Sequence, residues 1–303
     1  MLNSPKSFPL SFLFFPVLTI GLSILSIGPA WATMEAAPST VDAHLHGIAA
    51  YAKRSPMVSI PAGWFQMGTN REDGDRHTFE KNYDNTEFPQ SRIWLDGFQI
   101  DQYEVSLGEF LEFLPRSDRK VSPQLRNLIW HLISVHFIPD QALAPWPALY
   151  VTWEEAQSFC FNRGKRLPSE AEWEKAARGT AGKIFPWGQQ DPSPEIAVFG
   201  AYHVHEIPLV ANVDSFPEGK SEWGVFHLAG NIAEWANDWF GPDYYPIMPK
   251  RNPPGSKMGR YKVVRGGSWK SLPVMLRGAT RGGAIPEERS PNIGFRCAKT
   301  AIE

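Results

Sequence analysis

The stretch "VTWEEAQSFCFNRGKRLPSEAEWEKAARG", residues 151–179, contains the same helix-start signal twice. Thr152 is followed three residues later by Glu155, and Ser169 is followed three residues later by Glu172. Each pair matches a capping box, in which the first side chain caps the helix and the glutamate bonds back to the cap. The stretch therefore predicts one helix from Thr152 to about Phe161 and a second from Ser169 to Gly179, where glycine ends it.

The segments before this stretch predict strands and turns. "MVSIPAGWFQMG", residues 57–68, predicts two strands around a Pro-Ala-Gly turn. "RIWLDGFQIDQYEVS", residues 92–106, alternates apolar and polar residues and predicts a strand pair that turns at Asp96-Gly97. Ser106 then starts a helix. Residues 115–147 form an insertion with a second helix at 123–136, and residues after Gly179 predict short strands and loops.

Composition favours a turn-rich chain with a large aromatic core. The sequence has 303 residues, with 12 tryptophans, 25 glycines and 27 prolines. Buried tryptophans supply much apolar area where regular packing is sparse. The formal net charge of −2 gives no general attraction to nucleic acid or to an anionic membrane. We expect an α+β fold of low regular content, with one compact domain over residues 57–303.

The first 32 residues are typical of a signal peptide. Lys6 provides the positive charge, Phe8 to Ile27 is almost wholly apolar, and Ala30-Trp31-Ala32 is a small-x-small site for cleavage after Ala32. The alternative is an uncleaved membrane anchor, because the apolar run approaches membrane-spanning length. Both alternatives predict a periplasmic or secreted protein. Residues 33–56 are expected to form a loosely held leader with one short helix at 41–53.

Export makes the cysteine count informative. The sequence contains two cysteines, Cys160 and Cys297. An even number in an oxidising compartment favours a disulfide. Two buried free thiols are the alternative.

Seven blocks in order resemble one known family. They are "MVSIPAGWFQMG", "DQYEVS", the stretch quoted at the start, "FPWG", "GNIAEWANDWF", "VVRGGSW" and "NIGFRCA", across residues 57–298. Together they resemble the formylglycine-generating enzyme, or sulfatase-modifying factor, family. The resemblance implies a compact C-type-lectin-like α+β fold and descent from an exported oxidase. It also implies a disulfide between Cys160 and Cys297, which are joined in the family.

The resemblance has one clear exception, at the metal site. Family members with this activity oxidise a cysteine to formylglycine and hold copper on two cysteines shortly after the Gly-Gly-Ser-aromatic block. Those places fall near Ser271 and Leu276 here, and no cysteine lies between Trp269 and Arg296. Copper(I) is soft and prefers thiolates, which hydroxyl and methyl groups do not replace. Copper is therefore not expected, and the chain resembles a branch without the cysteine pair.

The resemblance also implies a possible calcium site in "GNIAEW". Its ligands would be the carbonyl oxygens of Gly230 and Ile232 and the side chain of Glu234, since calcium takes several oxygen ligands. His227 stands where the family has an amide or an acid, which weakens such a site. The alternative is that Glu234 accepts hydrogen bonds from buried backbone amides.

A candidate ligand pocket surrounds the paired glycines at 266 and 267. Arginines there would bind an anionic group through two parallel hydrogen bonds, and tryptophans would provide a flat apolar floor. Alternatively, the arginines pair with Glu170, Glu172, Asp238 or Glu287, and the tryptophans belong to the core. The candidate residues are Arg265, Ser268, Trp269, Ser271, Arg277, Arg281 and Trp235.

Two His-x-His pairs are weaker candidates for a metal site. They are His44/His46 and His203/His205, the latter followed by Glu206. On a strand each pair would present two imidazoles on one face, and the second would complete a two-histidine, one-carboxylate iron site. Surface histidines without a metal are the alternative.

Two functions fit the sequence, and whether the chain is an enzyme stays open. The first is oxidative modification or maturation of an exported protein or peptide without the copper-binding cysteine pair. The alternative is a non-catalytic accessory protein that recognises an exported protein, peptide or glycan through the cleft between "GNIAEW" and "RGGSW". Neither predicts a nucleic-acid partner, and a membrane contact is expected only if the signal segment is uncleaved.

Overall fold

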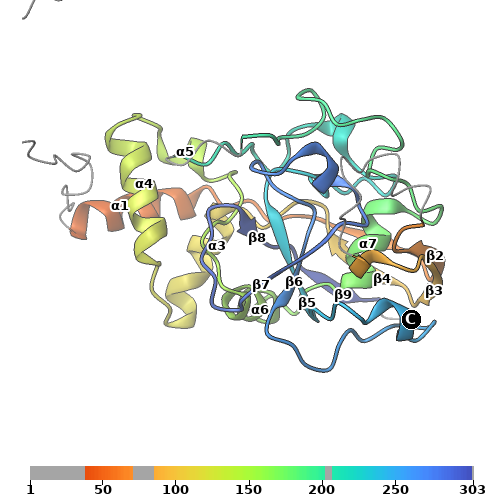
Figure 1. The fold of residues 1–303 in the computed structure, drawn as a ribbon. Helices are drawn as coiled ribbons and strands as arrows, with labels where there is room; N and C mark the ends of the chain where they lie inside the picture. Colours follow the sequence, from red (N-terminus) through yellow and green to blue (C-terminus); the bar gives the residue numbers. More distant parts are fainter. Residues whose placement is uncertain (1–37, 71–84, 202–206, 302–303) are drawn as a thin grey trace, which may run out of the picture. The chain divides into compact units, whose positions relative to one another are not determined.

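The computed structural model describes residues 38–70, 85–201 and 207–301 (Figure 1). The chain divides into two units, Met1–Glu35 and Ala36–Glu303, and the described residues all belong to the second. Short helices and short strands alternate with long irregular segments in this unit. The expected α+β class with low regular content is confirmed.

The two capping boxes form as predicted. Thr152 caps α6 (Trp153–Asn162), and its hydroxyl accepts from Glu155 N at 3.2 Å. Ser169 caps α7 (Glu170–Arg178) in the same way, with 3.2 Å between Ser169 Oγ and Glu172 N. Gly179 ends α7 with a positive φ of 66°, a conformation that glycine adopts without strain. These helices fix the chain on both sides of the tight turn at 163–168.

The predicted strands form, but they pair differently. β1 (Met57–Ile60) pairs with β4 (Phe98–Asp101), and β2 (Gly63–Met67) pairs with β3 (Ser91–Leu95), all antiparallel. The prediction of a hairpin at Asp96-Gly97 is wrong, because the strands on its two sides belong to different sheets. β9 (Ala298–Thr300) completes the sheet β1-β4-β9 from the far end of the chain. Alternating polarity identified the strands and carried no information about their partners.

The third sheet holds the segments of greatest functional interest. Its order is β7-β6-β5-β8, made of β5 (Ala233–Trp239), β6 (Lys262–Arg265), β7 (Arg281–Ala284) and β8 (Ile293–Gly294). β6 pairs antiparallel with both neighbours, whereas β8 runs parallel to β5. The sheet therefore brings "GNIAEW", "VVRGGSW" and "NIGFRCA" side by side.

The segment before residue 57 is part of the folded core. α1 (Pro38–Ala50) buries Val41, Leu45 and Ile48 in the same apolar cluster as α3 (Leu107–Phe113). Figure 1 shows both helices with α4 (Pro123–Ser134) and α5 (Asp140–Leu143), gathered at the end of this unit away from β2 and β3. The expectation of a loosely held leader is therefore wrong for residues 40–50. An apolar face at helical spacing, not the flanking polar residues, decides that packing.

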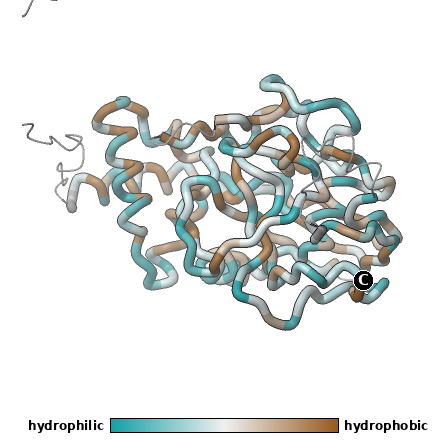
Figure 2. Tube along the Cα trace, viewed as in Figure 1, coloured by the Kyte–Doolittle hydropathy of each residue, from teal (hydrophilic) through white to brown (hydrophobic). Residues whose placement is uncertain are grey.

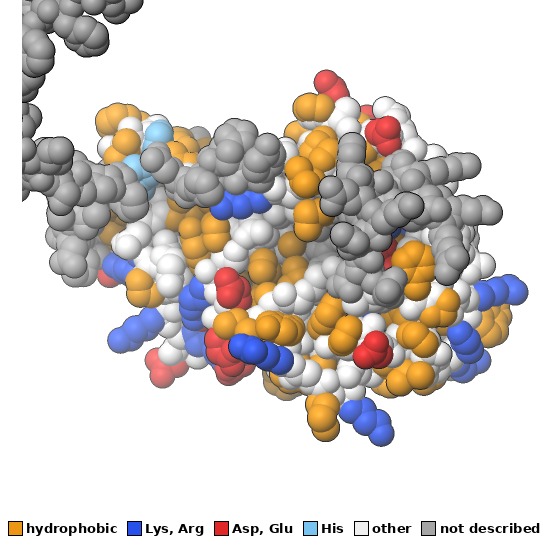
Figure 3. Space-filling view, in the orientation of Figure 1, with side chains coloured by type: hydrophobic (Ala, Val, Ile, Leu, Met, Phe, Trp, Pro, Cys, Tyr) orange, Lys and Arg blue, Asp and Glu red, His pale blue; other side chains and the backbone are white. Residues whose placement is uncertain are grey.

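Hydropathy follows this packing along the helices. In Figure 2 apolar and polar positions interleave along α1 and α4, as expected for helices with one buried face. α4 buries Leu125, Leu128, Ile129 and Leu132. On the face shown in Figure 3, basic and acidic side chains are interspersed with apolar ones. None of the helices in the described part of the chain is both long and apolar enough to cross a membrane.

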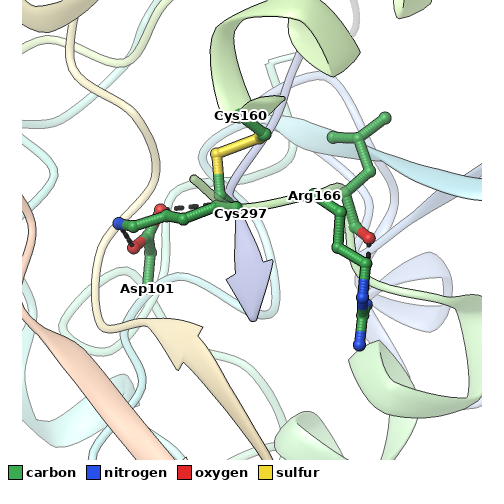
Figure 4. Close-up of a disulfide and its surroundings, with 6 residues drawn as sticks. Asp101, Cys160, Arg166 and Cys297 are labelled. Carbon is green, nitrogen blue, oxygen red and sulfur yellow. Dashed lines mark hydrogen bonds and ion pairs between the residues drawn. A yellow bond between two sulfur atoms is a disulfide. The ribbon is translucent and has the colours of Figure 1, made fainter. Parts of the chain in front are cut away.

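The predicted disulfide joins Cys160 at the end of α6 to Cys297 before β9, with 5.6 Å between the two Cα atoms (Figure 4). Asp101 supports the bridge, because its Oδ2 accepts from Cys297 N at 3.0 Å. Lys165 Nζ lies 2.5 Å from the other oxygen of the same carboxylate. The backbone of Arg166 also pairs with Ala298. The disulfide thus joins the residue before β9 to α6, and backbone hydrogen bonds join β9 to the turn between α6 and α7.

Candidate functional site

The two motifs expected to flank a cleft are bonded directly to each other. Glu234 on β5 lies opposite Arg265 on β6 in the antiparallel register. Beyond the strands, Gly230 N donates to Gly266 O at 3.0 Å, and Trp269 N donates to Asn231 O at 2.8 Å. "GNIAEW" and "RGGSW" therefore form one continuous wall, and backbone hydrogen bonds close the expected space between them.

The paired glycines allow the wall to turn sharply. Gly266 and Gly267 have φ values of 92° and 68°, which side chains rarely tolerate. A Cβ on Gly266 would lie 3.1 Å from the Trp173 ring, and one on Gly267 would lie 3.0 Å from Met275 O. Glycine is therefore required here both for the backbone angle and for close packing.

Hydroxyl and amide groups line the turn after the glycines. Ser268 N donates to Ser271 Oγ at 2.9 Å, and Asn292 Nδ2 donates to Ser268 Oγ at 3.3 Å. Ser290 Oγ bonds to Asn292 Oδ1. Ser268 is buried, but Lys270, Ser271, Ser290 and Asn292 are half-buried and reach the surface. The turn can donate and accept hydrogen bonds, and its side chains include no thiol, imidazole or carboxylate.

Ser271 and Leu276, near which the resemblance predicts the family's copper ligands, are both engaged in internal contacts. Ser271 is engaged by Ser268 N, and its carbonyl accepts from Gly200 N at 2.9 Å. Leu276 is fully buried in a small apolar cluster with Ile184 and Phe185. The two cysteines of the sequence are both used in the disulfide, so the chain has no free thiol.

Two of the three candidate arginines belong to a buried ion-pair network behind the wall. Arg281 Nε and Nη2 lie 2.6 and 2.9 Å from the two oxygens of Glu170, and Arg265 Nη2 lies 2.6 Å from Glu174 Oε2. Burial alone would raise the pKa of Glu170, but Arg281 and Arg265 outweigh burial, and the pKa is lowered. Arg265 also donates to three backbone carbonyls, at residues 278, 279 and 280. Both guanidinium groups therefore donate hydrogen bonds to the protein's own carboxylates and backbone carbonyls.

The third arginine is engaged in the same way. Arg277 makes two hydrogen bonds of 2.8 Å to Glu87, and both side chains are buried. Of the carboxylates anticipated as partners, Glu170 is used by Arg281, whereas Glu172 pairs with Arg166. The geometry thus supports internal pairing for all three arginines rather than an open anion pocket.

The candidate tryptophans are core residues. Trp235 and Trp269 are buried, and each indole N–H reaches a backbone carbonyl. Trp235 Nε1 donates to Val151 O at 2.9 Å, and Trp269 Nε1 donates to Pro291 O at 3.1 Å. Buried tryptophans with satisfied N–H groups stabilise a fold without any ligand.

Glu234, the expected calcium ligand, forms an internal ion pair. Its two oxygens lie 2.6 and 2.7 Å from Arg296 Nη2 and Nε, and Trp173 Nε1 donates to Oε2 at 2.9 Å. No hydrogen bond from the described residues reaches the carbonyl oxygens of Gly230 or Ile232. Calcium needs six to eight oxygens, and this carboxylate already accepts three hydrogen bonds. The donor set therefore fits a calcium ion poorly, and calcium binding stays a prediction.

A second carboxylate, Glu104, lies beside Glu234 and was not anticipated. Glu104 Oε2 accepts from Asn231 Nδ2 at 2.7 Å. Burial and the negative charge of Glu234 raise the pKa of Glu104 well above its ordinary value. Glu104 lies between a strand and a helix start in the sequence, where no local pattern distinguishes it. Only the tertiary fold brings it to "GNIAEW".

His227 is buried and neutral beside the same cluster. Its Nε2 donates to Asn212 O at 3.1 Å. Burial, and then the positive charge of Arg296, lower the pKa of His227 to about 4. The position that weakens the family's calcium site therefore holds an uncharged imidazole.

The histidine pairs do not assemble a metal site in the described residues. His44 and His46 lie on a helix instead of a strand, and they bond to different partners, Asp140 Oδ1 and Asp42 O. His203, His205 and Glu206 lie outside the described residues. Within 38–70, 85–201 and 207–301, no cluster of three or more histidine, cysteine, aspartate or glutamate side chains is placed to hold a metal.

Comparison with known proteins identifies the family and agrees with the fold. The model of the Sulfatase-modifying factor enzyme 1-like domain matches residues 47–301. The formylglycine-generating enzyme of Mus musculus is 30% identical over 292 residues, covering 80% of this chain and 74% of that protein. The inactive Cα-formylglycine-generating enzyme 2 of Bos taurus is 30% identical over 290 residues, covering 81% and 88%.

A solved structure gives the same result for the fold. PvdO from Pseudomonas aeruginosa superposes with a TM-score of 0.61 at 24% identity, covering 81% of this chain and 94% of that one. The protein therefore has the C-type-lectin-like fold of sulfatase-modifying proteins. The chain belongs to the formylglycine-generating enzyme family.

Proposed function

We propose that the protein is an exported member of this family that recognises an exported protein or peptide and does not carry out copper-dependent formylglycine generation. One observation carries the proposal: the chain's two cysteines are joined to each other, so no free thiol is left near Ser271 and Leu276, where the resemblance predicts the family's copper ligands. Without a thiolate pair, soft copper(I) has no suitable ligands.

The chemistry of the wall supports recognition. Its accessible groups are the ammonium of Lys270, the hydroxyls of Ser271 and Ser290 and the amide of Asn292. Such groups match the amide groups of a polypeptide or the hydroxyls of a glycan. None of them is an activated nucleophile, which would need an adjacent base. A periplasmic or secreted location is part of the proposal, and the disulfide supports it because such bonds persist in oxidising compartments.

Oxidative modification without copper is the second candidate function. The 30% identity to the formylglycine-generating enzyme of Mus musculus supports it, although the inactive enzyme 2 of Bos taurus is equally similar. In that case the oxidising group would come from outside the turn at 266–271.

The two candidates separate in one assay. The purified protein is incubated with copper and a cysteine-containing sulfatase peptide, and the peptide is examined by mass spectrometry for conversion to the aldehyde. We expect no aldehyde, with or without copper. Aldehyde formed only with copper would contradict the proposal. Aldehyde formed by copper-free protein would establish the second candidate.

Recognition is tested directly on peptides from exported proteins of the same cell. We expect saturable binding that is lost in Ser271→Arg, which blocks the wall, and retained in Lys257→Ala at an exposed site. Equal binding by both variants would place recognition elsewhere. Fractionation and N-terminal sequencing check the location, with cleavage after Ala32 as the expected result.

A further inference from the structure

A cavity of about 380 Å³ lies apart from the wall formed by "GNIAEW" and "RGGSW". It is bounded by the connection between β3 and β4, the start of α7, the end of β5 and the loop at 252–254. Its lining includes Asn237, Asp238, Arg166, Glu172, Pro253 and Pro254. A volume of this order accommodates a side chain or a small organic ion.

Asp238 is the unusual group in this cavity. It is 5% exposed, and its Oδ2 accepts from Glu170 N, at the first turn of α7, at 2.8 Å. Among the described residues, no hydrogen bond reaches its Oδ1. Gly255 leaves room for this oxygen, because a Cβ there would lie 2.2 Å from Oδ1. A largely buried carboxylate with one oxygen free of donors favours binding of a cation or of a proton.

The other charges around the cavity do not compensate Asp238. Arg166 makes two hydrogen bonds of 2.6 Å to Glu172, so its positive charge is already neutralised. Asp96 on the rim is paired with Arg251 at 3.1 Å. Asp238 is therefore the lining carboxylate that has no ion-pair partner among the described residues.

Lys262, whose charge acts on Asp238, contacts two aromatic rings and forms no ion pair with that carboxylate. Lys262 Nζ lies 3.9 Å from the ring centroids of both Trp153 and Trp239, and it donates to Asn237 O at 2.9 Å. Cation–π contacts of this kind hold an ammonium without a carboxylate. Burial, and then the charge of Glu170, raise the pKa of Asp238 to about 7 despite this lysine.

We propose that this cavity binds an alkylammonium group, whose N–H groups donate to Asp238 Oδ1 while its methylenes pack against Pro253 and Pro254. A compact ammonium fits a single unpaired oxygen, whereas a guanidinium needs two acceptors side by side. The group belongs either to a lysine side chain of a partner protein or to a free amine. The proposal does not depend on the recognition function of the serine wall.

The test uses the full-length exported protein at pH 8 and n-butylammonium as the probe, followed by calorimetry or by NMR chemical shifts. We expect saturable binding of n-butylammonium and none of n-butanol, which has the same carbon chain without the charge. A second titration with an acetylated, amidated lysine tripeptide separates the two sources. Binding of the tripeptide assigns the site to protein lysines, and binding of n-butylammonium alone assigns it to free amines.

Asp238→Asn is the decisive variant. Asparagine keeps an oxygen to accept from Glu170 N, so this hydrogen bond is retained while the charge is lost. We expect n-butylammonium affinity to fall at least about tenfold, since charged hydrogen bonds are the strong ones. Asp243→Asn, on an exposed loop, is the matched control and should bind as wild type does. Unchanged binding in Asp238→Asn, or no binding by wild type, would overturn the proposal.

A pH titration gives an independent check. Between pH 8 and pH 6 a carboxyl with a pKa of about 7 takes up its proton, so affinity should fall about tenfold. The same affinity at both values would count against Asp238 as the acceptor. The titratable or charged groups that face Asp238 are Glu170 and Glu172 on α7, Lys262 on β6, Arg166, and Tyr244 in the loop after β5.

Discussion

Arg281 and Glu170 are 111 residues apart in sequence and form a two-point ion pair in which the side chains are 0% and 2% exposed. Glu170 opens α7, and Arg281 opens β7, so the pair joins the capped helix to the edge of the four-stranded sheet. Glu174 extends the network by pairing with Arg265 and Arg178. The arginines near the glycine turn thus hold the fold together.

Removal of Arg281 is expected to destabilise the protein strongly. Arg281→Ala should lower the free energy of unfolding by about 3–5 kcal/mol, because it leaves the charge of Glu170 buried without a partner. Urea denaturation measures the loss. The double variant Arg281→Met, Glu170→Leu should lose less stability than the single variant, since no buried charge is then left without a partner.

Arg116→Ala is the surface control. It removes an ion pair whose arginine is 61% exposed, and it should lower the free energy of unfolding by no more than about 1 kcal/mol. Equal losses in Arg281→Ala and Arg116→Ala would contradict this role.

His227 predicts a specific dependence of stability on pH. Its pKa is about 4 in the folded protein and about 6.5 when unfolded. As the pH falls, His227 therefore takes up a proton at a higher pH in the unfolded state than in the folded state. The free energy of unfolding is highest above pH 6.5 and decreases as the pH falls toward 4. The loss reaches about 3 kcal/mol, from roughly 1.4 kcal/mol per pKa unit. His227→Gln should remove this part of the pH profile in thermal unfolding curves, whereas the exposed His136→Gln should not. Parallel profiles for wild type and His227→Gln would show that the imidazole is not buried neutral.

The disulfide is expected to be a major stabilising element. The double variant Cys160→Ala, Cys297→Ala should lose about 4–5 kcal/mol, because the bridge closes a long loop, of 137 residues. Chemical denaturation measures the loss, with reduced wild-type protein as the control. A thiol titration of denatured, unreduced wild type should find no reactive thiol. Two reactive thiols would refute the bridge.

Calcium is expected to leave the melting temperature unchanged. Glu234 is fully engaged with Arg296 and Trp173, so an added ion has to displace existing partners. Scanning calorimetry in calcium chloride and in chelator tests this. A calcium-dependent rise that disappears in Glu234→Gln would establish the site predicted from the family resemblance.

Local signals in the sequence predicted local structure well. The capping boxes at Thr152 and Ser169 located α6 and α7, because helix caps depend on residues three positions apart. The strands at 57–67 and 91–101 were also located. Their partners were not, since the register of a short strand depends on which surface covers it. A turn dipeptide at Asp96-Gly97 was insufficient to impose a hairpin.

The candidate site was predictable in part. The disulfide followed from family blocks that lie in sequence order, whereas the family's copper-thiol positions stay a prediction. Glu87 and Glu104 had no sequence signal, because each meets its partner through the tertiary fold. One clue was present: α7 is rich in charged residues, and Glu174 and Arg178 are four residues apart, the spacing of neighbours on a helix.

The packing of α1 against α3 limits where a recombinant fragment of the protein can begin. A recombinant fragment that begins at Met57 would keep every family block yet leave the α3 face uncovered where Val41, Leu45 and Ile48 normally sit. Exposed apolar surface of that kind promotes aggregation. Expression boundaries for biochemical work therefore belong upstream of Pro38, and a low yield from a shorter fragment would report a missing helix, not an unstable family domain.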